Sequence, residues 1–327
     1  MIITRAPLRM PLGGGGTDLP SYYSRRGGAL ISAAINKYIY ITVNRRFESS
    51  MRISYSKTEI VESIDAVEHP IVREVLNFLK LDSHLEITSV ADLPANTGMG
   101  SSSCFTVALL LALHTFKREH VSPQALAEEA YHIERVILGE PVGKQDQYLA
   151  AFGGVVTMDI APDGNVDVGS VVLDSNAQDD FESNLLLFYT GIRRSASAVL
   201  KSQDMKATEC ESDVLARLDR IKQIGNDIRQ AICDGDIRRF GLKMDEHWQT
   251  KKSLSSNIST SDVDRWYEIA LANGALGGKL MGAGGGGFLV FFCDSNKKAL
   301  RDAMGSEGLS EVKFHVDWDG AKVLVNL

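Results

Sequence analysis

The alternation of apolar and polar residues divides the chain into strand-like and helix-like segments. In the first 60 residues the pattern is typical of strands and turns, with apolar runs at 2–4, 29–43 and 51–55 around a glycine-rich loop. Residues 69–81 carry apolar side chains at positions 71, 72, 75, 76 and 79, which is the spacing of one helix face. This opening part therefore predicts strands accompanied by an amphipathic helix.

The middle of the chain continues this mixture of strands and helices. Residues 85–90 alternate as a strand does, and the apolar segment 104–116 repeats at helical spacing. A Ser-Pro step, an N-cap followed by proline at the first helical position, predicts a helix to about residue 138. Residues 153–160 and 166–173 predict a hairpin.

The second half has longer helical patterns. Residues 185–190 form an apolar run typical of a buried strand, and residues 214–232 keep one face apolar over five turns. A further helix is predicted over 262–273, ended by a glycine. Strands are predicted at 287–293 and near 312–316, with a helix between them.

The length of the chain predicts more than one domain. Its 327 residues exceed the usual size of a single domain. The chain turns polar and acidic around residues 175–180. We therefore expect two packed domains, 1–180 and 181–327.

Composition and charge exclude several classes of binding partner and site. A net charge of −7 argues against nucleic acid or an anionic membrane as a partner, because both require an excess of Lys and Arg. The four cysteines are scattered, so neither a zinc site nor a disulfide framework is indicated. The N-terminus lacks a signal-peptide pattern and no apolar run reaches membrane-spanning length, so we expect a cytoplasmic protein.

The glycine- and serine-rich segment that ends at Ser103 is the strongest candidate for chemistry. A strand precedes it and a helix follows, so its backbone N–H groups and a helix N-terminus point to one spot, which suits a phosphate. A tight turn with a serine N-cap would need only one hydroxyl, whereas three serines follow here. The predicted phosphate-binding residues are Pro94, Asn96, Thr97, Gly98, Met99, Gly100, Ser101, Ser102 and Ser103.

Two other glycine clusters lie near the ends of the chain, at 13–16 and 284–287. In chain order the clusters at 13–16, 94–103 and 284–287 are the first, second and third glycine clusters. With Gly282 the third cluster satisfies Gly-x-Gly-x-x-Gly, but a dinucleotide fingerprint must follow a strand and open a helix. Here the pattern predicts a helix before the cluster and a strand after it. A flexible hairpin-like loop is the alternative for one cluster alone, whereas three clusters at element junctions favour a shared pocket.

Three segments together resemble the GHMP kinase superfamily: Arg5–Asp18, Pro94–Ser103 and Lys279–Phe288. The first of them and the segment His247–Lys252 look most like bacterial D-glycero-D-manno-heptose 7-phosphate kinases, although fucose kinase domains share much of the first. The resemblance implies an α+β fold, with an N-terminal domain like ribosomal protein S5 domain 2 and a C-terminal ferredoxin-like domain.

The resemblance also implies an activity. It is the ATP- and Mg²⁺-dependent phosphorylation of the anomeric hydroxyl of heptose 7-phosphate to the 1,7-bisphosphate, for nucleotide-activated heptose in surface glycans. A kinase for an unphosphorylated sugar such as fucose, a non-catalytic sugar sensor, and a decarboxylase acting on mevalonate diphosphate stay open as alternatives. The expected partner is a small phosphorylated sugar, and the sequence leaves open whether the chain forms a homodimer.

Catalytic and metal-binding roles are carried over from the matching motif positions. Asp146 corresponds to the residue that accepts the proton of the substrate hydroxyl, and the alternative is that it only orients this hydroxyl. Arg9 corresponds to the basic residue that lies beside this carboxylate. Ser102 and Glu134 correspond to the Mg²⁺ ligands. The stretch between Glu134 and Asp146 is one residue longer than in mevalonate kinases.

Substrate-binding roles follow in the same way. Asp18 corresponds to the sugar-binding carboxylate of galactokinases, and a 7-phosphate would require a cationic cluster away from the nucleotide. The predicted substrate-binding residues are Gly14, Gly15, Gly16, Thr17, Asp18, Arg193, Arg194, Lys252, Gly284, Gly285 and Gly286. Paired basic residues also occur on solvated faces, which is the alternative for Arg193, Arg194 and Lys252.

Overall fold

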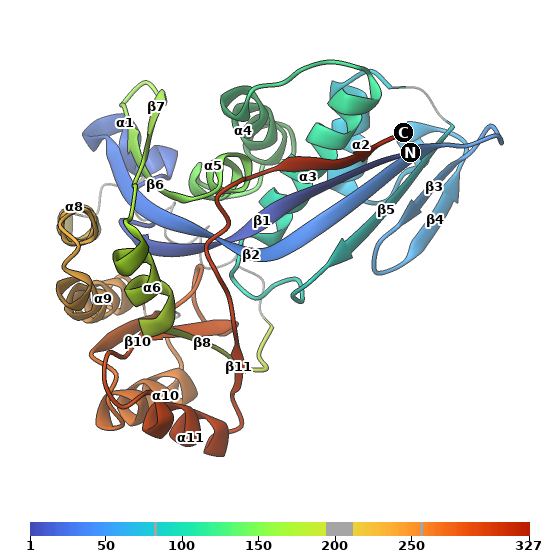
Figure 1. Cartoon of the computed structure of the whole chain (residues 1–327). Coiled ribbons are helices and arrows are strands. Elements are labelled where there is room, and N and C mark those ends of the chain that lie inside the picture. Colours follow the sequence, from blue (N-terminus) through green and yellow to red (C-terminus); the bar gives the residue numbers. More distant parts are fainter. Residues whose placement is uncertain (82–83, 194–211, 256–257) are drawn as a thin grey trace.

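A computed structural model describes residues 1–81, 84–193, 212–255 and 258–327, and it contains two β-sheets with helices packed against them (Figure 1). The larger sheet runs in the order β12-β1-β2-β5-β3-β4, and β6 and β7 continue from β2. Its strands are β1 (Ile2–Gly13), β2 (Gly28–Arg45), β3 (Met51–Ser54), β4 (Thr58–Val61), β5 (Leu85–Ala91), β6 (Val155–Ile160), β7 (Val166–Ser170) and β12 (Lys322–Asn326). The expected α+β class is confirmed.

Strand β1 is longer than the predicted strand over residues 2–4 because its prolines are placed where they cost no ladder hydrogen bond. β12 pairs with β1 only at residues 2–5, whereas β2 pairs with β1 along most of its length. Pro7 and Pro11 therefore lie beyond the β12 pairing, where one edge of β1 has no partner strand among the described residues. The pairing with β12 also brings the termini together, with the Met1 ammonium group 3.3 Å from the Leu327 carbonyl oxygen.

Helices cover one face of the larger sheet, and α3 is the longest of them. They are α2 (Pro70–Phe78), α3 (Ser101–Phe116), α4 (Pro123–Tyr131) and α5 (Gln145–Phe152), with a short π-helix at His132–Ile137 and a 3₁₀ turn at Ile64–Ala66. α3 contacts β1, β2 and α5, and nearly all of its side chains are buried. Its N-terminus is therefore fixed from several sides.

The smaller sheet is antiparallel, in the order β11-β8-β10-β9, and separates two hydrophobic clusters. Its strands are β8 (Leu185–Tyr189), β9 (Gly277–Leu280), β10 (Phe288–Phe292) and β11 (Ser310–Val312). Leu187 of β8 and Val290 of β10 belong to the cluster shared with the larger sheet. Leu186 and Phe291 belong to the second cluster, as the alternation of side chains along a strand requires.

Four further helices follow β8 in the described part of the chain: α8 (Ser212–Cys233), α9 (Ile237–Lys252), α10 (Ser261–Ala272) and α11 (Lys297–Ser306). Helices α9, α10 and α11 contact the smaller sheet, and α8 lies between α9 and strands β1 and β2 (Figure 1). The predicted apolar stripe of α8 joins both clusters, since Leu218 and Ile221 lie in the second cluster and Ile224 and Ile228 in the first. Among the described residues, no helix has the length and apolar character needed to cross a membrane.

Several elements differ from those that the sequence predicts. The acidic stretch near 175–180 is part of helix α6 (Ser175–Asn184), which the Asp174 carboxylate caps at Ala177 N. α1 (Pro20–Arg26), α5 and β12 were not predicted, and the strand expected at 312–316 ends at Val312. Strand β9, rather than a helix, precedes the third glycine cluster, so that cluster joins a hairpin. Its Gly-Gly-Lys-Leu sequence has no strand pattern of its own and forms a strand by pairing with β10.

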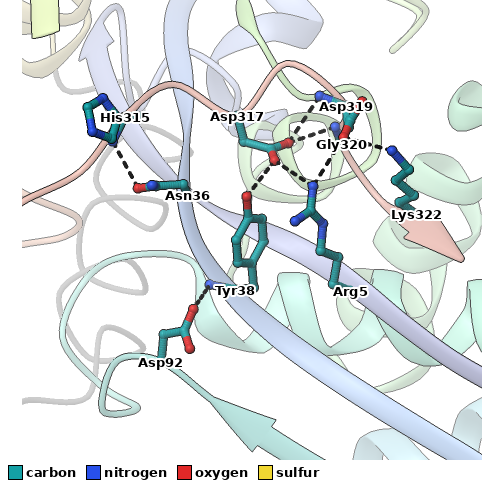
Figure 2. Close-up of polar contacts among 9 residues, drawn as sticks. All are labelled: Arg5, Asn36, Tyr38, Asp92, His315, Asp317, Asp319, Gly320 and Lys322. Atoms are coloured by element: carbon teal, nitrogen blue, oxygen red, sulfur yellow. Dashed lines mark hydrogen bonds and ion pairs between the residues drawn. The ribbon is translucent and has the colours of Figure 1, made fainter. Parts of the chain in front are cut away.

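The segment between β11 and β12 is fastened across β1 and β2 by polar contacts (Figure 2). Asp317 is buried and accepts hydrogen bonds from the Arg5 guanidinium at 3.1 Å and the Tyr38 hydroxyl at 2.8 Å. On the other side of Tyr38, its backbone N–H donates to the Asp92 carboxylate at 2.9 Å, and Asp92 N donates back to Tyr38 O. Residue 92 begins the glycine-rich loop, so this network fixes one end of that loop.

We expect the stability of the protein to depend on the protonation of His114. Its buried imidazole lies between two carboxylates, Nδ1 at 2.9 Å from Glu119 and Nε2 at 2.7 Å from Glu129, and the hydrogen bond to Glu129 raises the pKa of His114. A raised folded-state pKa gives stability that is complete below the unfolded value of about 6.5 and is lost as pH rises through the folded value. Urea unfolding of wild type and His114→Gln from acid to mildly alkaline pH should show their stability difference shrinking; a constant difference would contradict this.

Candidate active site

Arg9 and Asp146 form a two-pronged ion pair at the centre of the site. Arg9 Nε lies 2.6 Å from Asp146 Oδ1, and Arg9 Nη2 lies 2.8 Å from Asp146 Oδ2. β1 supplies the arginine and the first turn of α5 supplies the aspartate. Such fork-to-fork pairing fixes the orientation of both groups. The expected placement of Arg9 beside Asp146 is present in the structure.

The pair is attached directly to the glycine-rich loop. Arg9 Nη1 donates to the Gly98 carbonyl oxygen at 2.5 Å, and the backbone N–H of Arg9 donates to Met99 O at 3.3 Å. Gly100, at φ 75°, has no side chain, and a Cβ there would lie 3.1 Å from Asp146 Oδ2. The absence of a side chain therefore leaves room for the carboxylate beside the N-terminus of α3.

The neighbouring carboxylate favours the charged form of the buried Arg9 guanidinium. Burial alone would lower the pKa of the Arg9 guanidinium, but the Asp146 carboxylate raises it above its ordinary value. Asp146 is the less enclosed partner, with 25% of its side chain exposed against 8% for Arg9. The carboxylate can therefore be reached by a ligand while the guanidinium holds it from behind.

Glu134 is the centre of a second buried network beside the loop. It lies in the π-helix and accepts hydrogen bonds from Ser102 Oγ at 3.0 Å, Ser103 Oγ at 2.7 Å and Thr106 Oγ1 at 3.0 Å, and also from the Gln147 amide. Burial raises the pKa of the Glu134 carboxyl, and these donors oppose that effect. The sequence places Ser102 and Glu134 32 positions apart, and the fold brings their oxygens into contact.

This donor set suits Mg²⁺ held partly by phosphates. Mg²⁺ prefers hard oxygen ligands and is commonly bound by one or two carboxylates together with substrate phosphates and water. Ser102 and Glu134 provide one hydroxyl and one carboxylate oxygen 3.0 Å apart. Among the described residues no group of three or more His, Cys, Asp or Glu side chains could hold a metal alone. The pair thus fits a metal that arrives with a nucleotide.

The N-terminus of α3 has hydrogen-bond donors that no group among the described residues uses. Gly100 at the N-cap makes no side-chain cap, and the buried Ser101 hydroxyl has no hydrogen-bond partner. The Thr97 hydroxyl, in contrast, donates to Pro94 O at 2.9 Å and so closes the loop on itself. N–H groups at the start of a 16-residue helix, together with the unpartnered Ser101 hydroxyl, are donors of the kind that can hold an anion.

The Asp18 carboxylate is held by two backbone N–H groups, one of them from the first glycine cluster at residues 13–16. Its carboxylate accepts the backbone N–H groups of Gly16 at 3.0 Å and Gln145 at 3.1 Å. Burial raises the pKa of Asp18, and the nearby Asp146 raises it further, while these two N–H groups oppose the rise. The Thr17 hydroxyl turns inward, toward Gly14 O at 2.8 Å, so Thr17 supports the loop. Since Gln145 precedes Asp146, the two carboxylates are positioned by the same turn.

The second and third glycine clusters pack backbone against backbone, which agrees with the prediction that they share a location. A Cβ on Gly98 would lie 2.6 Å from the Met281 carbonyl oxygen, and one on Gly282 would lie 2.5 Å from Gly98 Cα. Gly287 touches Thr97 in the same way. The third loop is also fixed from its other side, where Gly285 N donates to Ile258 O at 3.0 Å.

Gly98→Ala is expected to lower the free energy of unfolding by about 1–3 kcal/mol, since the residue has φ 75° and faces the Met281 carbonyl. Gly305→Ala is the matched control: it lies in α11, away from the site, and a Cβ there would meet nothing within 4 Å. The free energy of unfolding of this control variant should rise by about 0.5–1 kcal/mol. Urea unfolding of both variants measures the difference, and similar values would contradict the close approach of the loops.

The structure describes two of the three residues that are predicted to bind the substrate phosphate, Arg193 and Lys252. Arg193 is exposed, and Arg194 lies outside the described residues. The Lys252 ammonium group lies 3.1 Å from Asp264 and faces the Trp248 ring. The preceding residue, Lys251, is the buried one, and its charge interacts with Arg9, Asp18 and Asp146.

Sequence reasoning missed Lys251, although a signal was present. The buried positions of α9 include Phe240, Met244, His247 and Trp248. Lys251 follows His247 by four residues and Trp248 by three, so it falls between them on this face and is buried. Lys252 follows Trp248 by four residues but His247 by five, and it is only half-buried. A lysine on an apolar helix face is unusual and would have singled out residue 251.

Comparison with known proteins finds two matching domain families. Residues 65–154 match the GHMP kinases N terminal domain, and residues 228–309 match the GHMP kinases C terminal domain. The D-glycero-alpha-D-manno-heptose 7-phosphate kinase of Campylobacter jejuni is 31% identical over 321 residues, which cover 93% of this chain and 94% of the relative.

Two further relatives extend this comparison. The crystal structure of a D-glycero-D-manno-heptose 1-phosphate kinase from Bacteroides thetaiotaomicron superposes with a TM-score of 0.84 and 26% identity, covering all of both chains. The L-fucokinase/L-fucose-1-P guanylyltransferase of Bacteroides fragilis is 25% identical over 91% of this chain, which spans only 35% of that longer protein.

Proposed function

The chain belongs to the GHMP kinase family, and on this premise we propose that it is an ATP-dependent sugar kinase that phosphorylates the anomeric hydroxyl of D-glycero-D-manno-heptose 7-phosphate. The product would be the 1,7-bisphosphate, a precursor for nucleotide-activated heptose in surface glycans. The heptose 7-phosphate kinase that is similar along nearly the whole chain supports this substrate.

The observation that carries the proposal is the Arg9–Asp146 pair at the N-terminus of α3. Phosphoryl transfer requires in-line positioning and neutralisation of charge, with little covalent chemistry by the protein. The Asp146 carboxylate accepts the proton that leaves the sugar hydroxyl as the hydroxyl oxygen bonds to the γ-phosphorus of ATP, while the bond from that phosphorus to the β–γ bridging oxygen breaks and ADP leaves. Arg9 fixes the orientation of that carboxylate and adds positive charge where the transferred group carries negative charge.

The nucleotide and its metal would be held by the loop and the Glu134 network. Backbone N–H groups of residues 96–103 and the unpartnered Ser101 hydroxyl would bind the phosphates. Ser102 and Glu134 would hold Mg²⁺, which, when bound, neutralises the phosphate charge. Glu134 must be ionised for this role, and its hydroxyl and amide donors favour the ionised form.

Asp18 and the first glycine cluster would bind the sugar. The Asp18 carboxylate accepts two backbone N–H groups and keeps further lone pairs for sugar hydroxyls. Residues 14–16 present backbone beside it. A buried carboxylate beside Asp146 suits a polyhydroxylated substrate, and its position next to the proton acceptor would set which hydroxyl is presented.

A kinase for an unphosphorylated sugar such as fucose is the second candidate. The fucokinase relative that matches most of this chain favours it, at lower identity than the heptose phosphate kinase. A sensor without catalysis is disfavoured by the complete set of Arg9, Asp146, Ser102 and Glu134, which sugar binding alone would not require.

ADP release with ATP and Mg²⁺ tests the proposal across heptose 7-phosphate, unphosphorylated heptose, mannose, fucose, galactose and mevalonate. The proposal predicts strong turnover of heptose 7-phosphate alone. Turnover of fucose without heptose 7-phosphate would keep the kinase and replace the substrate. Sugar binding without any turnover would favour the sensor.

A further inference from the structure

Three basic side chains are buried together beside the Arg9–Asp146 pair. His247 and Lys251 lie on the buried face of α9, and Lys279 lies on β9, against which α9 packs. Their side chains are almost fully enclosed, with residue exposures of 0%, 8% and 1%. We call these three residues the basic cluster. Three basic groups enclosed at one place require compensation, because a buried charge without a partner is costly.

The described residues provide little of that compensation. Lys251 Nζ donates to Gly282 O at 2.6 Å, and Lys279 Nζ lies 3.4 Å from Leu12 O. Neither lysine has a carboxylate in salt-bridge distance among the described residues, and both ring nitrogens of His247 lack a hydrogen-bond partner. The buried Lys144, by contrast, lies 2.6 Å from the Glu128 carboxylate. The two lysines of the basic cluster thus differ from Lys144, which is also buried but has a carboxylate partner.

The position of the cluster links it to the reacting groups. Leu12 and Gly282, which its lysines contact, belong to the end of β1 and to the third glycine loop. Gly282 touches Gly98, whose carbonyl oxygen accepts a hydrogen bond from Arg9, so two residues, Gly282 and Gly98, link Lys251 to the ion pair. The charge of Arg9 acts on both lysines, and the charges of Asp18 and Asp146 act on Lys251.

We propose that Lys251 and Lys279, supported by His247, form a buried subsite for a phosphate dianion on the sugar side of the Arg9–Asp146 pair. This proposal rests on the proposed kinase function, and it assigns a phosphate group to the part of the site that the basic cluster forms. The dianion has two sources, the phosphate already on the sugar or the phosphoryl group in transfer. In either case it takes the place of the missing carboxylate partners.

The acid–base state of the cluster supports this assignment. Burial lowers the pKa of Lys251 to about 8, and the positive charge of Arg9 contributes while Asp18 and Asp146 oppose it. Burial also lowers the pKa of Lys279 and His247, and the neighbouring lysines add to the effect. A bound dianion favours the charged form of both lysines. The alternative is that both lysines are structural and neutral, in which case a methionine of similar shape would replace them without effect on catalysis.

The test compares Lys251→Met and Lys279→Met with Lys243→Met. Lys243 is a matched control on α9, where it pairs with Asp227 at 2.9 Å and Glu246 at 2.8 Å. Steady-state kinetics would give kcat, KM for ATP and KM for the sugar phosphate, with thermal unfolding to verify folding. Lys251→Arg, which keeps the charge, should recover part of any loss.

If the sugar phosphate is the ligand, KM for it rises about 10–30-fold in each Met variant of the cluster, while kcat and the control change less than about threefold. If the ligand is the phosphoryl group in transfer, kcat falls by that factor instead. Inorganic phosphate also distinguishes the sources in the wild type: it competes with the sugar phosphate in the first case and with ATP in the second.

Unchanged kcat and KM in both Met variants, with no inhibition of the wild type by phosphate, would overturn the subsite. Failure of the proposed substrate gives a different pattern. The wild type would then turn over an unphosphorylated sugar, and the kcat of the Met variants on that sugar would still test whether the cluster binds the transferred group.

Discussion

Asp146→Asn is expected to lower kcat by about 10²–10⁴-fold and to leave KM for the sugar within about threefold. The amide has the shape of the carboxylate but cannot take the proton that the sugar hydroxyl releases as it attacks phosphorus. The substitution also removes the negative partner of the buried Arg9, so the free energy of unfolding should fall by about 1–3 kcal/mol. ADP release under saturating substrates, together with urea unfolding, measures both effects.

Asp262→Asn is the matched control for this substitution. Asp262 likewise lies in the first turn of a helix, α10, but it is exposed and its nearest basic group is Arg265 at 3.8 Å. Its kcat should equal that of the wild type. A loss of less than about tenfold in Asp146→Asn would show that the residue only orients the substrate and would contradict a proton-accepting role.

Glu134→Gln should raise the Mg²⁺ concentration for half-maximal activity by about 10–100-fold. One of the two carboxylate oxygens becomes an NH₂ group, which removes both the negative charge and a metal ligand. The same group faces a site built from hydroxyl and amide donors, so stability should fall by about 1–3 kcal/mol. A titration of initial rate with MgCl₂ at fixed ATP measures the first effect.

Glu59→Gln controls for the general cost of neutralising a buried carboxylate. Glu59 is 6% exposed and accepts hydrogen bonds from the Tyr55 hydroxyl and Glu68 N, each at 2.6 Å. It should lose stability without a change in Mg²⁺ requirement. If both variants require more Mg²⁺, or neither does, the assignment of Glu134 as a ligand is wrong.

The sequence predicts most of this site where the signal is local. The strand, the glycine loop and the serines that begin α3 are contiguous, so the strand–loop–helix arrangement follows from local spacing alone. The α+β GHMP kinase fold, expected from the resemblance, is confirmed by the domain matches and by the similar crystal structure. The amphipathic helices α2 and α8 also lie where their periodicity predicts.

The hydrophobic and polar pattern of a sequence does not predict contacts between segments that are far apart in the chain. Arg9 and Asp146 are 137 positions apart, and only the family resemblance paired them before the fold was known. The short strands β9 and β12 have little apolar alternation and form because a partner strand is present. Lys252 was preferred to Lys251 because two adjacent lysines look equivalent in a sequence, whereas on a helix they point to different sides.

The position of the new phosphate tests the central claim most directly. Heptose 7-phosphate, ATP and Mg²⁺ would be incubated with the enzyme, and the product examined by ³¹P NMR with coupling to the sugar protons. We predict one new phosphate signal coupled to the proton on C1, and its loss with Asp146→Asn. A phosphate on any other carbon, or ADP formed without a phosphorylated sugar, would contradict the assignment of this site as an anomeric sugar-phosphate kinase.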